Sequence, residues 1–201
     1  MKSKVKKLGG GESRKEYDKI IETMNFNPDS THKFISDGLH KLENTNLRGN
    51  VLELFVCETL KRLEITPFYH QVRVDKIPDT EFDIVCYHPV YPVVLSCKAS
   101  LRERYKQAAY EGCNFKNVYR NAKCYLITVD KSEAVKLKKK IEKGKVLGID
   151  GCYLADHKEF SDFLIDLKNQ YEFSVAKQIN PITKGKLIQK NKSSGKVKPA
   201  S

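Results

Sequence analysis

The chain has 201 residues, with 37 Lys and Arg against 25 Asp and Glu, and a formal net charge of +12. This length is enough for one domain with a real core, and the positive charge favours a polyanionic partner, either nucleic acid or an anionic membrane surface. No apolar run approaches the roughly 20 residues that a membrane span requires, and no apolar signal core follows the N-terminal lysines. We therefore expect a soluble, cytoplasmic protein that does not enter a membrane.

The six cysteines are scattered, mostly within apolar runs, with no Cys-x-x-Cys pair. This pattern argues against a structural zinc site and favours small buried side chains that stay reduced. Cys97 stands between Ser96 and Lys98 on an expected strand, so alternation turns it to the opposite face from both. We expect it to pack in the core rather than to act as a nucleophile.

The first segments of the chain are expected to be helical. Residues 1–11 are rich in Lys and Gly and are expected to be disordered, and 12–45 form an N-terminal helical segment. Its helices are expected at 12–24 and, after the turn and cap residues from Asn27, to about Leu42. A longer helix is expected over 46–63, because apolar residues recur there near the 3.6-residue period until Pro67 ends it.

The middle of the chain alternates short apolar runs with helical patterns. Successive strands are expected at 68–75, 81–87 and 92–98, joined as an antiparallel meander by short turns. Ser100 is expected to cap a helix through about Cys113. A buried strand at 124–129, a helix at 132–143, a short strand near 152–154 and a helix at 158–169 follow. We therefore predict an α/β fold with a mixed sheet flanked by helices over residues 46–172.

Residues 173–201 form a basic tail, because no acidic residue follows Glu172 while lysines continue among Gly and Ser. A solvated flexible tail explains this composition. A non-specific phosphate-binding arm, whose contribution falls steeply with salt, explains it too.

Asp83, Lys98 and Glu111 form the most informative pattern in the chain. Phosphodiester hydrolysis needs a hard cation, and Mg²⁺ is usually held by one or two carboxylates with water and phosphate. Asp83 and Glu111 are candidate metal ligands, and Lys98 ends the next strand on the face that also carries Ser96. Its ammonium would then orient or help deprotonate the attacking water. Taken singly, a surface ion pair explains Asp83 and an ordinary exposed lysine explains Lys98; together they favour a nuclease.

These residues resemble the PD-(D/E)xK nuclease superfamily, in which an Asp is followed at a distance by an acid, any residue and Lys. Ser96 stands where the acid is usual, a departure similar to that of type II restriction endonucleases that cut CCGG- and CCNGG-type sites. In that group the next helix supplies the carboxylate, and Glu111 matches it. The resemblance covers about residues 46–130. It implies a restriction-endonuclease-like core, Mg²⁺, double-stranded DNA as partner and a prokaryotic cytosol.

Arg102-Glu103-Arg104 looks like the element with which this group recognises adjacent C:G pairs. The chemistry agrees, because Arg donates to guanine O6 and N7 while Glu accepts from cytosine N4. We expect the triplet in the first turn of a helix, although a salt-bridged helix surface is how such triplets commonly end. Candidate contacts to the DNA backbone are Ser96, Lys106, Lys116 and Arg120.

Glu53 is a further candidate, because its neighbours at i+3, i+4 and i+7 are apolar and a buried carboxylate needs a partner. Its position matches that of a glutamate which, in the superfamily, often helps to bind metal or hold the lysine. Glu58 is a weaker candidate. Pro78-Asp79 spells the letters of the motif name, but it falls in an expected turn, so we prefer Asp83.

We predict a Mg²⁺-dependent type II restriction endonuclease that cuts a short, GC-containing site. Two strands need two active sites, so a C2 homodimer is expected. A structure-selective nuclease, such as a junction resolvase or repair enzyme, stays open as an alternative. So does a catalytically inactive DNA-binding module of the same fold, for which Ser96 is the best support.

Overall fold

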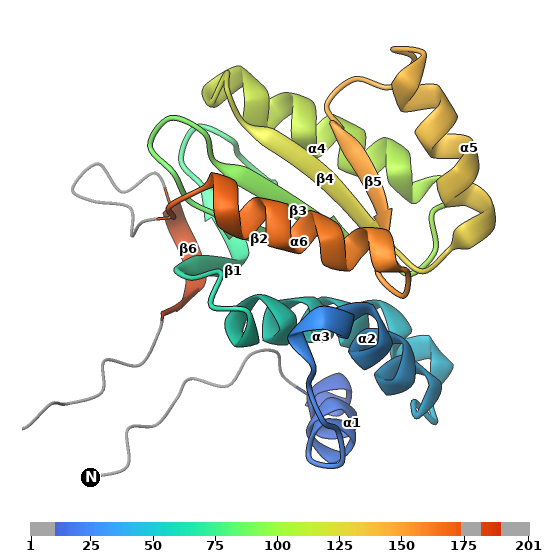
Figure 1. Cartoon of the computed structure of the whole chain (residues 1–201). Coiled ribbons are helices and arrows are strands. Elements are labelled where there is room, and N and C mark those ends of the chain that lie inside the picture. The colour runs from blue at the N-terminus through green and yellow to red at the C-terminus, as the bar shows by residue number, and fades with distance from the viewer. Residues whose placement is uncertain (1–10, 174–181, 190–201) are drawn as a thin grey trace, which may run out of the picture.

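The computed structural model describes residues 11–173 and 182–189. Its centre is a six-stranded mixed sheet with the order β5-β4-β3-β2-β1-β6 (Figure 1). The strands are β1 Phe68–Val74, β2 Phe82–Cys86, β3 Val93–Cys97, β4 Lys123–Thr128, β5 Gly151–Leu154 and β6 Ile182–Ile188. The helices are α1 Gly11–Ile21, α2 Thr31–His40, α3 Arg48–Arg62, α4 Arg104–Val118, α5 Lys131–Glu142 and α6 Lys158–Gln170, with 3₁₀ turns at Pro28–Ser30 and Thr45–Leu47.

The connections between strands decide their directions. Short turns join β1 to β2 and β2 to β3, and these pairs are antiparallel. Helices α4 and α5 cross over between the next strands, and β3, β4 and β5 are parallel, because a parallel connection needs a crossover longer than a hairpin turn. The predicted α/β fold with a mixed sheet flanked by helices is confirmed.

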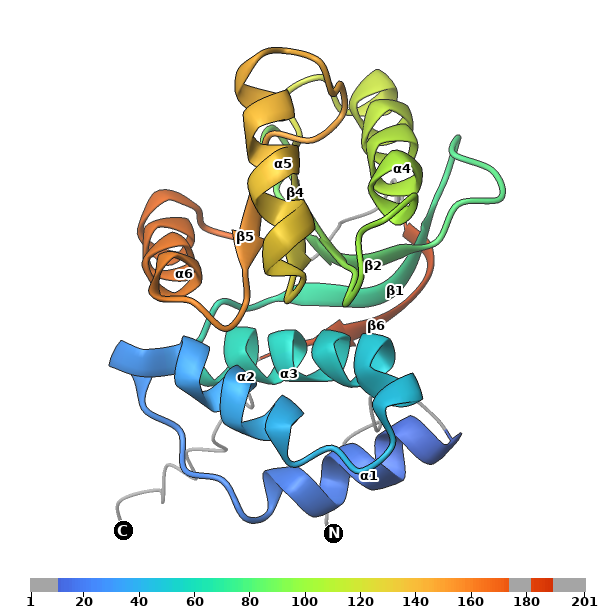
Figure 2. The ribbon, with the colours of Figure 1, turned by 90° about the vertical axis from the view of Figure 1, so that its right-hand side faces the viewer.

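The helices cover the two faces of the sheet, as Figure 2 shows. Helices α1, α2 and α3 lie below the sheet in this view, and α4 and α5 lie above it. The larger apolar core includes Phe55 of α3, Phe160 of α6 and Leu95 of β3. Smaller apolar clusters lie under α4 and α5, where Phe115 packs against Phe82 with ring centroids 5.0 Å apart. Fully buried strands such as Val93–Cys97 fit a sheet that is covered on both sides.

Strand β6 corrects one expectation, because residues 173–201 were expected to be a flexible tail. Residues 182–188 instead pair with β1 in the antiparallel direction. An uncovered β1 edge would leave backbone groups unpaired, and β6 satisfies them. Lys184 also pairs with Glu81 at 2.6 Å. Residues 174–181 and 190–201 of that expected tail, with Lys177 and the lysines from Lys190 onward, lie outside the described residues, as do residues 1–10.

Candidate active site

Asp83 on β2 meets Lys98, the residue that directly follows β3. Ile84 pairs with Leu95 across the two strands, so Asp83 stands opposite Ser96. The Asp83 Oδ2 atom accepts hydrogen bonds from the Cys97 amide at 2.7 Å, Lys98 Nζ at 2.8 Å and Ser96 Oγ at 3.3 Å. Because all three donors use Oδ2, the other oxygen, Oδ1, is not engaged by them. The structure thus brings together the two strand-end residues on which the nuclease interpretation depended.

The surroundings of Lys98 favour its charged form. Burial alone would lower the pKa of this ammonium, but the Asp83 carboxylate outweighs burial, and Glu111 adds to its effect, so the pKa of Lys98 is raised. The side chain is 12% exposed and that of Asp83 is 18% exposed. A lysine held as a cation can orient water or a phosphate oxygen. Such a cation is poorly suited to take a proton.

Glu111 of α4 lines a small pocket beside Asp83. Asp83, Ser96 and Glu111 line this pocket together with apolar residues such as Phe82 and Val94. Burial raises the pKa of Glu111; the charge of Lys98 and a hydrogen bond from Gln107 Nε2 to Oε1, 2.7 Å long, act in the opposite direction. A carboxyl whose pKa is raised by burial still lacks enough positive charge around it. A divalent cation between Asp83 and Glu111 would supply that charge.

A close contact between two glycines fixes the depth of α4. A Cβ atom on Gly112 would lie 2.2 Å from the carbonyl oxygen of Gly148, and one on Gly148 would lie 2.1 Å from the carbonyl oxygen of Ala109. Gly148 also has φ +83°, which glycine adopts without steric cost. The loop before β5 therefore presses directly on the helix backbone beside Glu111, and it holds that carboxylate over the sheet.

Asp150 anchors the same loop. Its Oδ2 accepts a hydrogen bond from the Cys124 amide at 2.7 Å and pairs with Lys116 Nζ at 2.7 Å. Lys116, expected as a weak contact to the DNA backbone, thus also joins α4 to this loop. Of the other expected backbone contacts, Arg120 is exposed, and Lys106 is exposed and pairs with Glu103.

The Arg102-Glu103-Arg104 triplet lies mostly before α4 rather than in its first turn. Helix α4 begins at Arg104, with Glu103 in the capping position and Arg102 at φ +20° in the preceding turn. The expectation that Ser100 caps this helix was wrong. Leu101 is fully buried and its amide donates to Asp130 Oδ2 at 3.1 Å, so the chain must enter the core and turn before the helix starts. All three side chains are exposed.

Glu53 lies on the other side of the sheet from the pocket. Its Oε1 atom is 2.5 Å from Nε2 of His70 on β1, a ring that is 1% exposed. Neither ring nitrogen has a hydrogen-bond partner of good geometry in the described part of the chain. His70 pairs with Ile84 across the strands, which places it on the face that α3 covers. Sequence reasoning found Glu53 but missed His70, because no local pattern joins the two.

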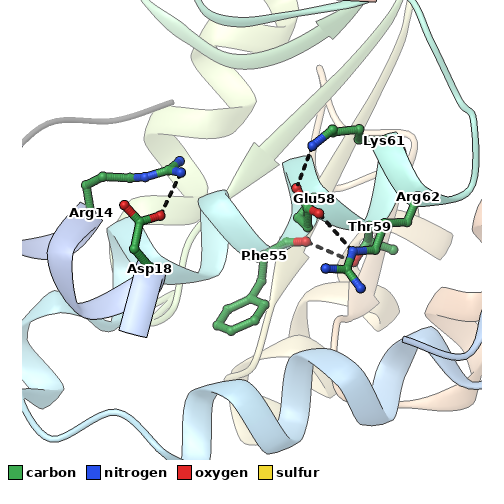
Figure 3. A network of polar contacts seen from close by, with 7 residues as sticks. All are labelled: Arg14, Asp18, Phe55, Glu58, Thr59, Lys61 and Arg62. Atoms are coloured by element: carbon green, nitrogen blue, oxygen red, sulfur yellow. Dashed lines mark hydrogen bonds and ion pairs between the residues drawn. The ribbon is translucent and has the colours of Figure 1, made fainter. Parts of the chain in front are cut away.

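The structure also locates the remaining candidate residues, which are Glu58, Asp79 and Cys97. Glu58 pairs with Arg62 at 2.8 Å and with Lys61 at 3.4 Å along α3 (Figure 3). It does not line the pocket. Asp79 is exposed in a turn at φ +57°, which agrees with the preference for Asp83. Cys97 packs in the larger core, as expected, and burial raises the pKa of its thiol.

Two carboxylates border the pocket, and the described residues contain no group of three or more His, Cys, Asp or Glu side chains arranged to hold a metal. This donor set fits Mg²⁺, which commonly takes one or two protein carboxylates and completes its shell with water and phosphate. Gln107, which the sequence reasoning overlooked, stands four residues before Glu111; that helical spacing was the signal that could have found it.

Comparison with known families decides the assignment. The family described as BsaWI restriction endonuclease type 2 matches residues 58–178, more than half of the chain. The chain belongs to the BsaWI restriction endonuclease type 2 family. Its members are type II restriction endonucleases and act on DNA. The matched range contains Asp83, Lys98 and Glu111, and Glu53 precedes it.

No curated protein and no solved structure matches the chain. None of the helices in the described ranges is long and apolar enough to cross a bilayer.

Proposed function

We propose that this chain is a Mg²⁺-dependent type II restriction endonuclease that hydrolyses both strands of double-stranded DNA at a short GC-containing site. One observation supports this most strongly. The Asp83 carboxylate and the Lys98 ammonium are in contact beside a pocket that Glu111 also lines. The family assignment supplies the reaction class, and this geometry supports the choice of residues for it.

Asp83 and Glu111 would hold the metal. Asp83 would bind through Oδ1, the oxygen that its three donors do not use. Glu111 would bind through its buried carboxylate, and the cation would offset the cost of keeping that carboxylate charged. Glu53 is proposed as a further ligand or as a support for the site. When bound, Mg²⁺ would activate water and neutralise charge on the phosphate.

Lys98 would position the attacking water and the scissile phosphate. Its charged side chain is held by Asp83 at 2.8 Å, so its direction is fixed before DNA binds. An oriented cation of this kind stabilises negative charge that develops in the transition state. Ser96, at the acid position of the motif, would hold Asp83 through its hydroxyl rather than bind metal.

Arg102, Glu103 and Arg104 would read the bases. The three side chains are exposed at the start of α4, a few residues from Lys98, so base reading and cleavage would be mechanically linked. An Arg that binds guanine through two hydrogen bonds contributes about 1–3 kcal/mol of discrimination. A C2 homodimer would give each strand its own active site. A restriction enzyme meets foreign DNA in the prokaryotic cytosol, where we propose that this protein acts.

Digestion of unmethylated phage DNA tests the function. The purified protein is incubated with this DNA in Mg²⁺ or in EDTA, and the fragment ends are sequenced. The expected result is a set of discrete fragments that form only with Mg²⁺ and share one GC-containing sequence at their ends. Cleavage of branched DNA in preference to any linear sequence would favour the structure-selective nuclease, and binding without any cleavage would favour the inactive module.

A further inference from the structure

A groove lies between α4 and α5, on a different side of α4 from the catalytic pocket. Helix α4 contributes Tyr105, Lys106 and Tyr110, α5 contributes Lys140, and the loop before β5 contributes Lys145 and Leu147. The groove encloses about 460 Å³. None of the functions described above uses it except through Lys106. We call it the α4–α5 groove.

The walls of the α4–α5 groove are held in place. Lys140 Nζ donates to the Tyr105 hydroxyl at 3.2 Å and lies 4.8 Å from the centre of the tyrosine ring, so one cation is fixed against one wall. The loop wall is fixed by the contact of Gly148 with Gly112. A preformed groove binds a partner without the entropy cost of ordering a mobile loop.

The charge of the groove has one sign. Three lysines line it, of which Lys106 pairs with Glu103 outside the groove, and no acidic side chain lines it in the described part of the chain. Tyr110 and Leu147 are 68% and 74% exposed at its rim, which is unusual for side chains of this size. Lysines beside exposed apolar surface match a strand of nucleic acid, in which phosphates alternate with apolar sugar faces.

The groove is continuous with the parts of α4 that the proposed reaction uses. Lys106 follows Arg104 by two residues, and Tyr110 is adjacent to Glu111. Successive helical residues are turned by about 100°, so Tyr110 faces away from the pocket by roughly a quarter turn. A duplex whose bases are read at the start of α4 would therefore pass along the groove on one flank.

We propose that the α4–α5 groove binds the sugar–phosphate backbone of double-stranded DNA flanking the bases that the Arg102–Arg104 turn reads, an inference that rests on DNA being the substrate. Lys140 and Lys145 contact phosphates, and Tyr110 packs against deoxyribose. The groove thereby adds affinity that is independent of sequence.

Salt dependence of binding tests the charged contacts. The variant Lys140→Gln/Lys145→Gln is compared with wild type and with Lys139→Gln/Lys143→Gln, which removes two lysines from the same end of α5 outside the groove. Binding to a random-sequence duplex is measured by fluorescence anisotropy in EDTA at several salt concentrations. Because each phosphate contact contributes about 0.9 to the slope of log K against log salt, the groove variant should lose nearly 2 from that slope. The control should retain the wild-type slope, and equal slopes in the two variants would overturn the proposal.

Tyr110→Ser tests the apolar contact and the competing occupant, a second copy of the chain. The expected result is weaker binding to the duplex with an unchanged salt slope, in a protein whose sedimentation behaviour matches wild type. If the variant instead shifts toward monomer while its DNA binding is unchanged, the groove contacts a second copy of the chain and does not bind DNA. Neither measurement requires cleavage. If the groove variant loses salt slope but the wild-type protein cuts no DNA, the proposed DNA binding by the groove stands and the nuclease function is rejected.

Discussion

The two faces of the sheet carry different kinds of polar group. On the α4 face, Asp83 receives three donors on one oxygen while burial raises the pKa of nearby Glu111. On the α3 face, the buried His70 ring contacts the Glu53 carboxylate. On the α4 face, hydrogen-bond donors and positive charge are therefore concentrated at Asp83, while Glu111 has too little positive charge around it. Such an imbalance is typical of a functional site.

The largest expected effect comes from Lys98→Ala on the α4 face. Removing this oriented cation should lower the single-turnover rate of DNA cleavage by about 10²–10³-fold, with DNA binding retained, because its charge acts mainly on the transition state. Lys158→Ala on α6, whose side chain is 78% exposed, is the matched control and should cleave like wild type. A Lys98→Ala enzyme with the wild-type rate would remove this residue from catalysis.

The variant Glu53→Gln tests whether the α3 face also contributes to the reaction. If Glu53 supports the metal site, the Mg²⁺ concentration for half-maximal cleavage should rise by about 10-fold or more, as for groups that hold metal ligands. Glu58→Gln is the control on the same helix, since its carboxylate pairs with Arg62. Identical Mg²⁺ curves for the two variants would confine Glu53 to its contact with His70.

Substitutions at two helix glycines, one on each side of the sheet, compare how each side affects the free energy of unfolding. Gly112→Ala in α4 places a methyl group against the Gly148 carbonyl, so it should destabilise the protein by about 1–3 kcal/mol and slow cleavage by shifting Glu111. Gly49→Ala in α3 meets nothing within 4 Å and should stabilise by about 0.5–1 kcal/mol. Urea unfolding measures both, and a tolerated Gly112→Ala would show that the loop contact does not set the depth of α4.

The smallest expected effect concerns Asp130, which caps α5 and holds the Leu101 amide. Burial opposes the charge of this carboxylate, but hydrogen bonds from the amides of Leu101 and Glu133 and from the Ser132 hydroxyl, together with the charge of Arg102, outweigh burial and lower its pKa. Asp130→Ala should therefore cost about 0.5–2 kcal/mol at neutral pH.

The pH dependence of this cost follows from the sign of the shift. Stability from a lowered carboxyl pKa is complete above the ordinary Asp range and is lost as pH falls through the folded value. The gap between wild type and Asp130→Ala in urea unfolding should close in acid, while Lys139→Ala, at an exposed position of the same helix, serves as the control. A gap that widens in acid would contradict the assignment.

The sequence predicted what depends on local patterns. Apolar periodicity identified the strands that carry Asp83 and Lys98, and alternation put Lys98 and Ser96 on one face. It could not predict contacts between distant segments. Strand β6 was missed because its lysines and Gly185 resemble a solvated tail, and only the open edge of β1 makes it a strand. The start of α4 was misplaced because Asp130 lies 29 positions from Leu101 in the chain.

A calorimetric titration tests the central claim, which is that Asp83 and Glu111 form a metal site beside Lys98. Mg²⁺ is titrated into the Lys98→Ala protein with its cleavage-site duplex bound, and then into the same protein carrying Asp83→Asn as well. We expect metal binding in the first sample and its loss in the second. Equal Mg²⁺ binding in both would contradict it and would place the metal elsewhere in the complex.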